Sequence, residues 1–142
     1  MIRVPFTITH PDLTPIQAHP GDAGMDLRAA EAGHLMAGER RLVPTGLRVA
    51  IPAGYEGQVR PRSGLALRYG LTIPNSPGTV DSSYRGPVGV ILHAAGASVR
   101  WERGDRIAQL VIVPVPQVEL VAVESLDETE RGTGGFGSTG VS

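Results

Sequence analysis

Short apolar runs separated by Gly and Pro recur roughly every ten residues along this chain, a spacing typical of β-strands joined by turns. Several runs alternate apolar and polar residues with a period of two, as a strand with one buried face does. The runs are LRVAIP (47–52), EGQVRP (56–61), GLTIP (70–74), PVGVILHA (87–94), ASVRW (97–101), DRIAQLVIVP (105–114) and QVELVAVE (117–124). The pattern predicts an all-β fold, either a sandwich, a jelly roll or a barrel.

A single stretch, SGLALRYG at 63–70, has the composition of a helix. We expect Ser63 to cap its first turn and Gly70 to end it. The stretch MDLRAAEAG (25–33) lies among glycines, and we expect a strand followed by a turn there. The 19 Gly and 12 Pro residues also suit a turn-rich β protein better than a helical one.

Composition narrows the possible functions. The net charge of −1 gives no general attraction to nucleic acid or to an anionic membrane. All 13 basic residues are Arg, so lysine chemistry is excluded and phosphate would be held by Arg or backbone N–H groups. With no Cys and four scattered His, neither a disulfide nor a zinc site is expected. No segment resembles a signal peptide or a membrane span, so we expect a cytoplasmic protein.

The apolar residues thin out after about Asp127, and we therefore predict a folded domain over 1–127 and a Gly-rich tail over 128–142. The tail contains RGTGGFGSTG (131–140), whose glycines match dinucleotide and Walker A loops only superficially, because no helix can follow them. Its Gly N–H groups and hydroxyls could wrap an anion, while Arg131 and Phe136 could grip a phosphate and stack on a ring. The alternative is a solvated tail with an incidental Phe.

Other stretches carry both a structural and a functional interpretation. Arg62 and Ser63 lie at the start of the predicted helix. They could bind phosphate there, or Ser63 could be an ordinary N-cap. Asp81 lies in a predicted hairpin, NSPGTVDSSYRG (75–86), as a turn residue or as an acid that takes a proton from water. Asp105 and Arg106 are expected to form a buried ion pair.

Two polar residues inside apolar segments also have open roles. Gln109 interrupts an apolar run and could face a ligand. Asp26, between Met25 and Leu27, is either a satisfied structural acid or a functional one, because an unpaired buried carboxylate is costly.

Five stretches in order, AGMDL, PRSGLA, GTVDSSYRG, RGDRIAQL and RGTGGFGSTG, resemble the five motifs of the trimeric deoxyuridine triphosphatases (dUTPases). The likeness runs from Ala23 to Gly140. It implies a β jelly roll that forms a homotrimer and hydrolyses dUTP to dUMP and pyrophosphate. It also implies that each active site takes its first, second and fourth motifs from one chain, its third from another and its tail from the last.

The resemblance assigns a role to each matching residue. Asp81 is similar to the catalytic carboxylate that activates the attacking water, and Tyr84 to the ring beneath the deoxyribose. The residues that would read uracil are Asn75, Gly78, Thr79 and Val80, and those that would grip phosphate are Arg62, Ser63, Gly64 and Gln109. In the tail, Phe136 resembles a lid on uracil, Arg131 a γ-phosphate contact, and Gly137, Ser138 and Thr139 phosphate wrappers. Mg²⁺ is implied as the cofactor, held mainly by the triphosphate and supported through water by Asp26.

Two rival functions remain. A dCTP deaminase resembles dUTPases in fold and trimer, but its deaminating members carry a catalytic Glu on the strand after the hairpin. The corresponding stretch here, GPVGVILHAAG (86–96), has no acid. The second rival is a non-catalytic jelly-roll binding module, against which the intact Asp81 and tail motif argue.

Overall fold

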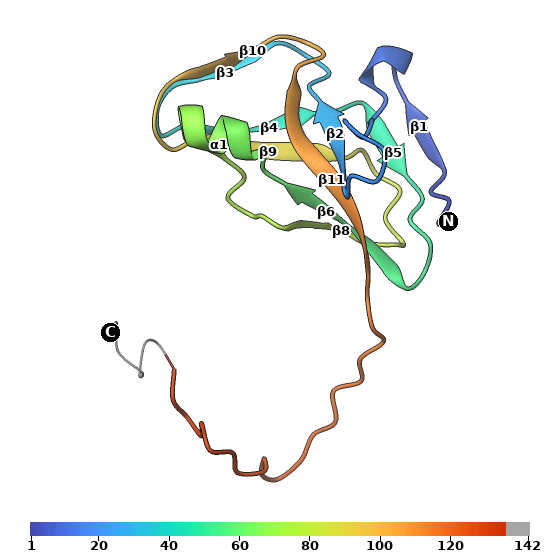
Figure 1. Cartoon of the computed structure of the whole chain (residues 1–142), viewed down its shortest axis with the longest axis vertical. Coiled ribbons are helices and arrows are strands. Elements are labelled where there is room, and N and C mark those ends of the chain that lie inside the picture. The colour runs from blue at the N-terminus through green and yellow to red at the C-terminus, as the bar shows by residue number, and fades with distance from the viewer. Residues whose placement is uncertain (136–142) are drawn as a thin grey trace.

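The computed structural model describes residues 1–135, and it confirms a mostly β protein with one short α-helix. Figure 1 shows a folded body from which the C-terminal segment extends away. The elements in chain order are β1 (Phe6–Ile8), η1 (Pro11–Leu13), β2 (Gly24–Arg28), β3 (Gly33–Leu35), β4 (Arg40–Pro44), β5 (Leu47–Val49), β6 (Tyr55–Arg60), α1 (Ser63–Tyr69), β7 (Leu71–Thr72), β8 (Gly78–Val80), β9 (Gly89–Ala94), β10 (Val99–Trp101) and β11 (Arg106–Pro114). Within residues 1–135 the helices are too short to span a bilayer.

Every pair of strands that is hydrogen-bonded in the described chain is antiparallel. The largest sheet has the order β2-β11-β6-β8, and a second has the order β4-β9-β7. Two smaller pairs, β1-β5 and β3-β10, complete the body. Neighbours in the largest sheet come from distant parts of the sequence, so this sheet places β2 beside β11 and β8 at the opposite edge.

The core is formed by the buried faces of these strands. In β9, residues at alternate positions are buried (Val90, Leu92 and Ala94), as the period of two predicts. Thr45 is the one buried polar residue in the described chain, and its hydroxyl donates a hydrogen bond of 2.6 Å to the Val88 carbonyl. That bond offsets the cost of removing the hydroxyl from water.

Strand β11 departs from strict alternation. Ile107 and Leu110 are both buried although an odd number of positions separates them. The register against β2 shifts between Arg106 and Ala108, so the strand contains a bulge. The extra residue turns Arg106 and Gln109 toward the same side, where both line one hollow.

The strand predicted at the start of 25–33 and the hairpin at 75–86 are confirmed, and the chain bends at residues 30–31 after that strand. Residues 24–28 form β2, and the strands that flank the predicted hairpin, β7 and β9, pair with each other. Inside that connection the chain makes a further strand, β8, which pairs with β6 in the other sheet.

Three expectations from the sequence are wrong. Ser63 is the first helical residue and not the cap, because Arg62 occupies the cap position without a side-chain cap bond. The predicted Asp105–Arg106 pair does not form, since Arg106 binds Asp26 and the Asp105 carboxylate accepts from the Glu102 N–H. The run at 117–124 forms no strand, and within residues 1–135 the last strand ends at Pro114.

Candidate active site

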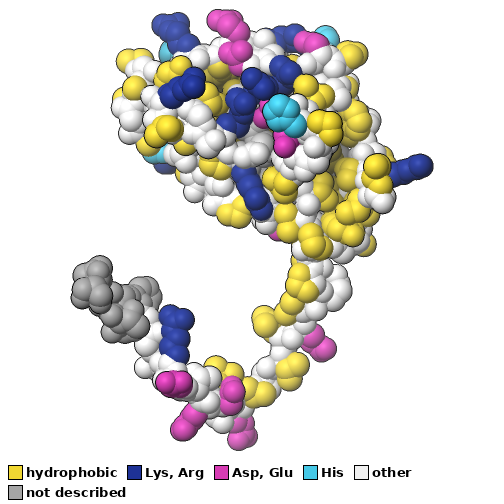
Figure 2. All heavy atoms as spheres, viewed as in Figure 1, with side chains coloured by type: hydrophobic (Ala, Val, Ile, Leu, Met, Phe, Trp, Pro, Cys, Tyr) yellow, Lys and Arg dark blue, Asp and Glu magenta, His cyan; other side chains and the backbone are white. Residues whose placement is uncertain are grey.

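Residues from β2, α1 and β11 surround a hollow of about 680 Å³, which we call the arginine hollow. Its lining residues are Ala18, Asp22, Ala23, Gly24, Asp26, Arg62, Ser63, Gly64, Leu65, Arg68, Tyr69, Arg106 and Gln109. Basic side chains gather on the same face of the body, between α1 and β2 (Figure 2). Guanidinium groups in a concave, partly dry setting favour an anionic ligand such as a phosphate.

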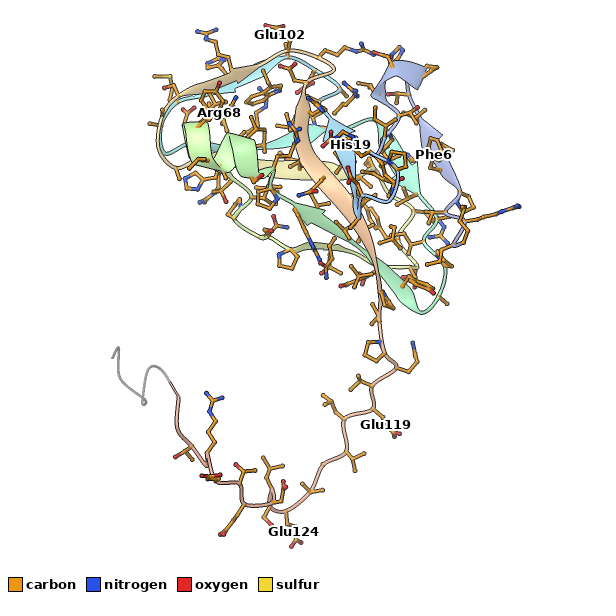
Figure 3. The ribbon with its side chains drawn as sticks, in the orientation of Figure 1. Phe6, His19, Arg68, Glu102, Glu119 and Glu124 are labelled. Carbon is orange, nitrogen blue, oxygen red and sulfur yellow. The ribbon has the colours of Figure 1, made fainter. Side chains whose placement is uncertain are left out.

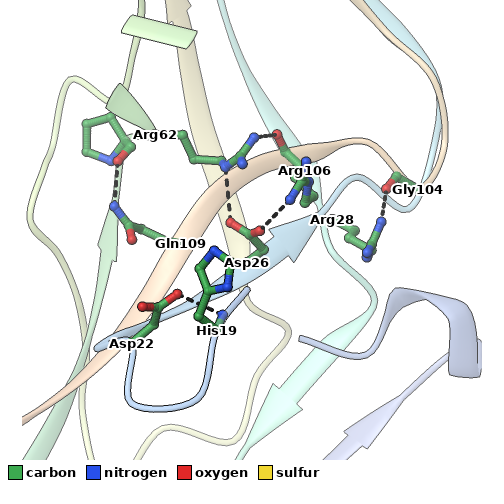
Figure 4. A network of polar contacts seen from close by, with 9 residues as sticks. His19, Asp22, Asp26, Arg28, Arg62, Gly104, Arg106 and Gln109 are labelled. Atoms are coloured by element: carbon green, nitrogen blue, oxygen red, sulfur yellow. Dashed lines mark hydrogen bonds and ion pairs between the residues drawn. The ribbon is translucent and has the colours of Figure 1, made fainter. Parts of the chain in front are cut away.

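Asp26 is the centre of the polar network in this hollow (Figure 4). One carboxylate oxygen forms an ion pair with Arg62 Nε at 3.0 Å, and the other accepts a hydrogen bond from Arg106 Nη1 at 3.2 Å. The Asp26 side chain is 13% exposed, so these contacts compensate for most of its lost hydration. Arg62 also donates to the Arg106 carbonyl at 3.2 Å, which fixes both arginines relative to β11.

Gln109 occupies the wall of the same hollow. Its amide N–H donates to the Pro61 carbonyl at 3.0 Å, next to the start of α1. Across the β2-β11 pair, Gly24 provides the room, because a Cβ at that position would overlap the Gln109 side chain. The Gln109 side chain is thus held beside Ser63 and Gly64, whose N–H groups in the first turn have no partner within the helix.

A second hollow, of about 400 Å³, lies around the segment between β7 and β9, and we call it the hairpin hollow. Its lining residues are Leu42, Pro44, Val59, Ile73, Asn75, Gly78, Thr79, Val80, Asp81, Tyr84, Pro87, Val88, Gly89 and Ile91. Most of these side chains are apolar, and the polar groups are concentrated on the segment 75–84. A narrow apolar slot edged by backbone amides and one Asn suits a flat heterocycle.

Asp81 and Tyr84 both line this hollow, but only the Tyr84 side chain has a hydrogen-bond partner among the described residues. The Tyr84 hydroxyl donates to the Pro87 carbonyl at 3.0 Å, and the ring packs over Gly86, where any Cβ would overlap the phenol. The side chain of Asp81 makes no hydrogen bond or ion pair with any residue from 1 to 135. Its carboxylate is exposed and is available to a bound water or ligand.

The two hollows share no lining residue. Asp26 is on β2 and Asp81 follows β8, which are the opposite edges of the four-stranded sheet. Three inter-strand steps separate these edges, a distance of roughly 14 Å at the usual strand spacing. One chain therefore gathers all the predicted body residues, but into two groups that cannot touch the same atom.

The predicted tail residues belong to neither group. Arg131 is in the described chain, where its Nε donates to the Gly134 carbonyl at 2.9 Å. No residue of 115–135 lines either hollow. Phe136, Gly137, Ser138 and Thr139 lie outside the described residues.

The arginine hollow contains oxygen ligands that suit Mg²⁺, the cofactor that the family likeness implies. Mg²⁺ takes oxygen ligands and keeps several waters, usually with one or two carboxylates and substrate phosphates. Asp26 and Asp22 line the hollow, and no cluster of three or more metal-binding side chains exists within residues 1–135. This set fits an ion that arrives with a phosphate ligand and contacts Asp26 through water.

Sequence reasoning missed the pairing of Arg106 with Asp26 and the presence of Arg68 and Tyr69 in the arginine hollow. The bulge in β11 decides the first, and its signal was visible. Two buried apolar residues at odd spacing, Ile107 and Leu110, cannot share one face of a regular strand.

Comparisons with known proteins identify the family to which this chain belongs. The family model "dUTPase" matches residues 13–140. A deoxyuridine 5'-triphosphate nucleotidohydrolase of Anaeromyxobacter sp. (strain Fw109-5) is 63% identical over 121 residues, covering 84% of this chain and 82% of the relative. One from Cutibacterium acnes is 54% identical over 138 residues, covering 96% and 91%.

Solved structures show the same fold. A Staphylococcus bacteriophage 80alpha dUTPase with dUPNHPP superposes with a TM-score of 0.90 at 31% identity, covering 99% of this chain and 100% of the phage chain. A mutant dUTPase from phage phi11 of S. aureus, whose structure reveals the coordination of a structural Mg(II) ion, has a TM-score of 0.80 at 26% identity. It covers 87% of this chain and 98% of the phage chain.

Proposed function

This chain belongs to the dUTPase family and hydrolyses dUTP to dUMP and pyrophosphate, and from that premise we propose that Asp81 activates the attacking water in a site shared between copies. The observation that carries the proposal is the unpaired carboxylate at the hairpin hollow, set apart from the anion-binding groups. The family membership also favours hydrolysis over the deamination of dCTP and over a non-catalytic module.

In the proposed reaction, uracil enters the hairpin hollow against the backbone of Gly78 to Val80, with Asn75 beside it. Tyr84 lies under the deoxyribose and leaves no room for a 2′-hydroxyl. The Asp81 carboxylate takes a proton from a water molecule while the oxygen of that water attacks the α-phosphorus. The bond from the α-phosphorus to the bridging oxygen breaks, and pyrophosphate leaves with that electron pair.

The phosphates would be gripped by the residues of the arginine hollow. Arg62 and the N–H groups of Ser63 and Gly64 bind non-bridging oxygens, and Gln109 supplies an amide donor. Mg²⁺, when bound, would neutralise the developing charge on the phosphates, with Asp26 supporting it through water. Since phosphoryl transfer depends chiefly on positioning and charge stabilisation, these groups suffice without a lysine.

The separation of the hollows supports the proposed trimer, which the family likeness implies. Asp81 and the phosphate grip, which consists of Arg62, Ser63, Gly64 and Gln109, must act on neighbouring atoms. One chain holds them on opposite edges of a sheet. A second copy that presents its hairpin hollow to the arginine hollow of the first removes this conflict. A closed ring of three such head-to-tail contacts gives three equivalent sites.

The segment 115–126 supports the same arrangement. It extends from the body in Figure 1, with hydrophobic side chains that are largely exposed, among them Leu120 at 95% and Leu126 at 84%. A run of exposed apolar side chains of this kind marks an interaction site. The tail that follows would then reach a site on another copy, where Arg131, Phe136 and residues 137–139 close over the nucleotide. Cytoplasmic localisation remains part of the proposal.

Substrate choice is tested by pyrophosphate release from dUTP, dTTP, dCTP and UTP, together with ammonia release from dCTP. We expect release from dUTP to exceed that from the other three by orders of magnitude, because the slot excludes the thymine methyl and the 2′-hydroxyl. Ammonia from dCTP, or equal release from dUTP and UTP, would contradict the proposal.

Sharing between copies is tested by mixing two inactive variants, Arg62→Ala and Asp81→Asn. If each site combines Arg62 of one copy with Asp81 of another, random reassembly restores about a quarter of the sites. A mixture that stays as inactive as its parents would contradict a shared site. Mixing either variant with itself is the matched control.

A further inference from the structure

Arg68 lines the arginine hollow but belongs to none of the residues assigned above. It lies in the last turn of α1 and carries the only basic side chain there (Figure 3). In a helix, a long side chain leans over the turn that precedes it, so Arg68 projects over Gly64. Gly64 has no side chain, and a Cβ at that position would meet nothing within 4 Å. The path from Arg68 to the phosphate grip is therefore open.

The charges around the hollow single out Arg68. Arg62 and Arg106 share the carboxylate of Asp26. Arg68 makes no hydrogen bond or ion pair through its side chain with any residue in the described range 1–135. Three arginines and two acids, Asp22 and Asp26, line the hollow, so Arg68 provides its excess of positive charge.

We infer that Arg68 is a further substrate-binding residue, whose guanidinium contacts the outer phosphates of the bound nucleotide. This inference rests on the proposed function, because it takes the α-phosphate to be held near Ser63 and Gly64. Arg68 approaches that grip from the far end of α1, away from the base. Its contribution increases with the number of phosphates, whereas that of Asp81 is confined to the reacting α-phosphate.

The test compares Arg68→Ala and Arg68→Lys with Arg100→Ala, an exposed Arg on β10 that lines neither hollow. Affinities for dUMP, dUDP and dUpNHpp are measured by calorimetry with Mg²⁺, and KM and kcat are measured with dUTP. For Arg68→Ala we expect about tenfold weaker binding of dUpNHpp, less than twofold weaker binding of dUMP, and an increase in KM larger than any decrease in kcat. Arg68→Lys should recover part of the loss, because it keeps the charge and loses the fork.

Equal weakening for dUMP and dUpNHpp would overturn the inference, since it would indicate a general disturbance of the site. Unchanged dUpNHpp affinity in Arg68→Ala would overturn it as well. Ala favours helix, so the substitution should leave α1 intact, and thermal unfolding of each variant checks this. Failure of the proposed function looks different, because the unmodified chain would then release no pyrophosphate from dUTP whatever Arg68 does.

Discussion

The arginine hollow and the hairpin hollow are built in opposite ways. The first collects side chains from β2, α1 and β11, and Asp26 ties Arg62 to Arg106. The second comes largely from the single stretch 73–91, and the carboxylate of Asp81 has no partner within residues 1–135. The arginine hollow is thus fixed by contacts inside the chain, whereas the Asp81 carboxylate of the hairpin hollow has no polar partner among the described residues.

The strongest test of this contrast is Asp81→Asn, which removes the proton acceptor of the hairpin hollow and leaves the arginine hollow unchanged. We expect kcat to fall by about 10²–10⁴-fold, the usual contribution of a general base, with little change in dUpNHpp affinity. Pyrophosphate release and calorimetry measure the two effects. Turnover at the original rate would remove Asp81 from the mechanism.

The next test asks what joins the two hollows. A chain ending at Glu130 lacks Arg131 and the rest of the Gly-rich tail, but keeps every residue of both hollows and the segment 115–126. We predict unchanged assembly by light scattering and a decrease in kcat/KM of about 10²-fold, since the lid would no longer hold the nucleotide or exclude water. An unchanged rate would show that the hollows alone complete the site.

A smaller effect is expected from Asp26→Ala, which removes the shared acceptor of Arg62 and Arg106. We predict an increase in KM of about tenfold and a need for more Mg²⁺, because the arginines lose their fixed position. Asp12→Ala is the matched control: Asp12 pairs with Arg103 at 2.7 Å on the surface and lines neither hollow. The hydrogen bond from Arg103 lowers the pKa of Asp12. Equal effects of the two substitutions would argue against a special role for Asp26.

The smallest expected effect is that of Gly86→Ala, a substitution beneath the Tyr84 ring that lines the hairpin hollow. The added methyl would overlap the Tyr84 ring and tilt it away from the Pro87 carbonyl. We predict that the preference for dUTP over UTP decreases about fivefold, since the ring no longer closes the space for a 2′-hydroxyl. Competition between the two nucleotides measures the ratio, and a ratio equal to that of the original chain would show that Tyr84 does not need this position.

The same contrast explains what the sequence could and could not predict. Most polar residues of the hairpin hollow come from the single stretch 75–86, so the sequence motif contains them. The end of α1 is also predicted correctly, at Gly70 with φ +62°. The arginine hollow depends on pairing between distant strands and on a bulge at one residue of β11. Proximity along the chain predicts that Asp105 pairs with Arg106, but the bulge directs Arg106 to Asp26 instead. The odd spacing of Ile107 and Leu110 indicates a bulge, but the sequence does not show which residue of β2 Arg106 then faces.

The placement of the hollows on opposite sheet edges has an effect on how the enzyme would behave in dilute solution. If the site is shared between copies as proposed, a single folded chain contains every required body side chain and is still inactive. Specific activity should therefore decline as the preparation is diluted below the dissociation range of its oligomer and recover when it is concentrated again. In such a molecule, the appearance of activity after synthesis reports the meeting of copies and not the completion of folding.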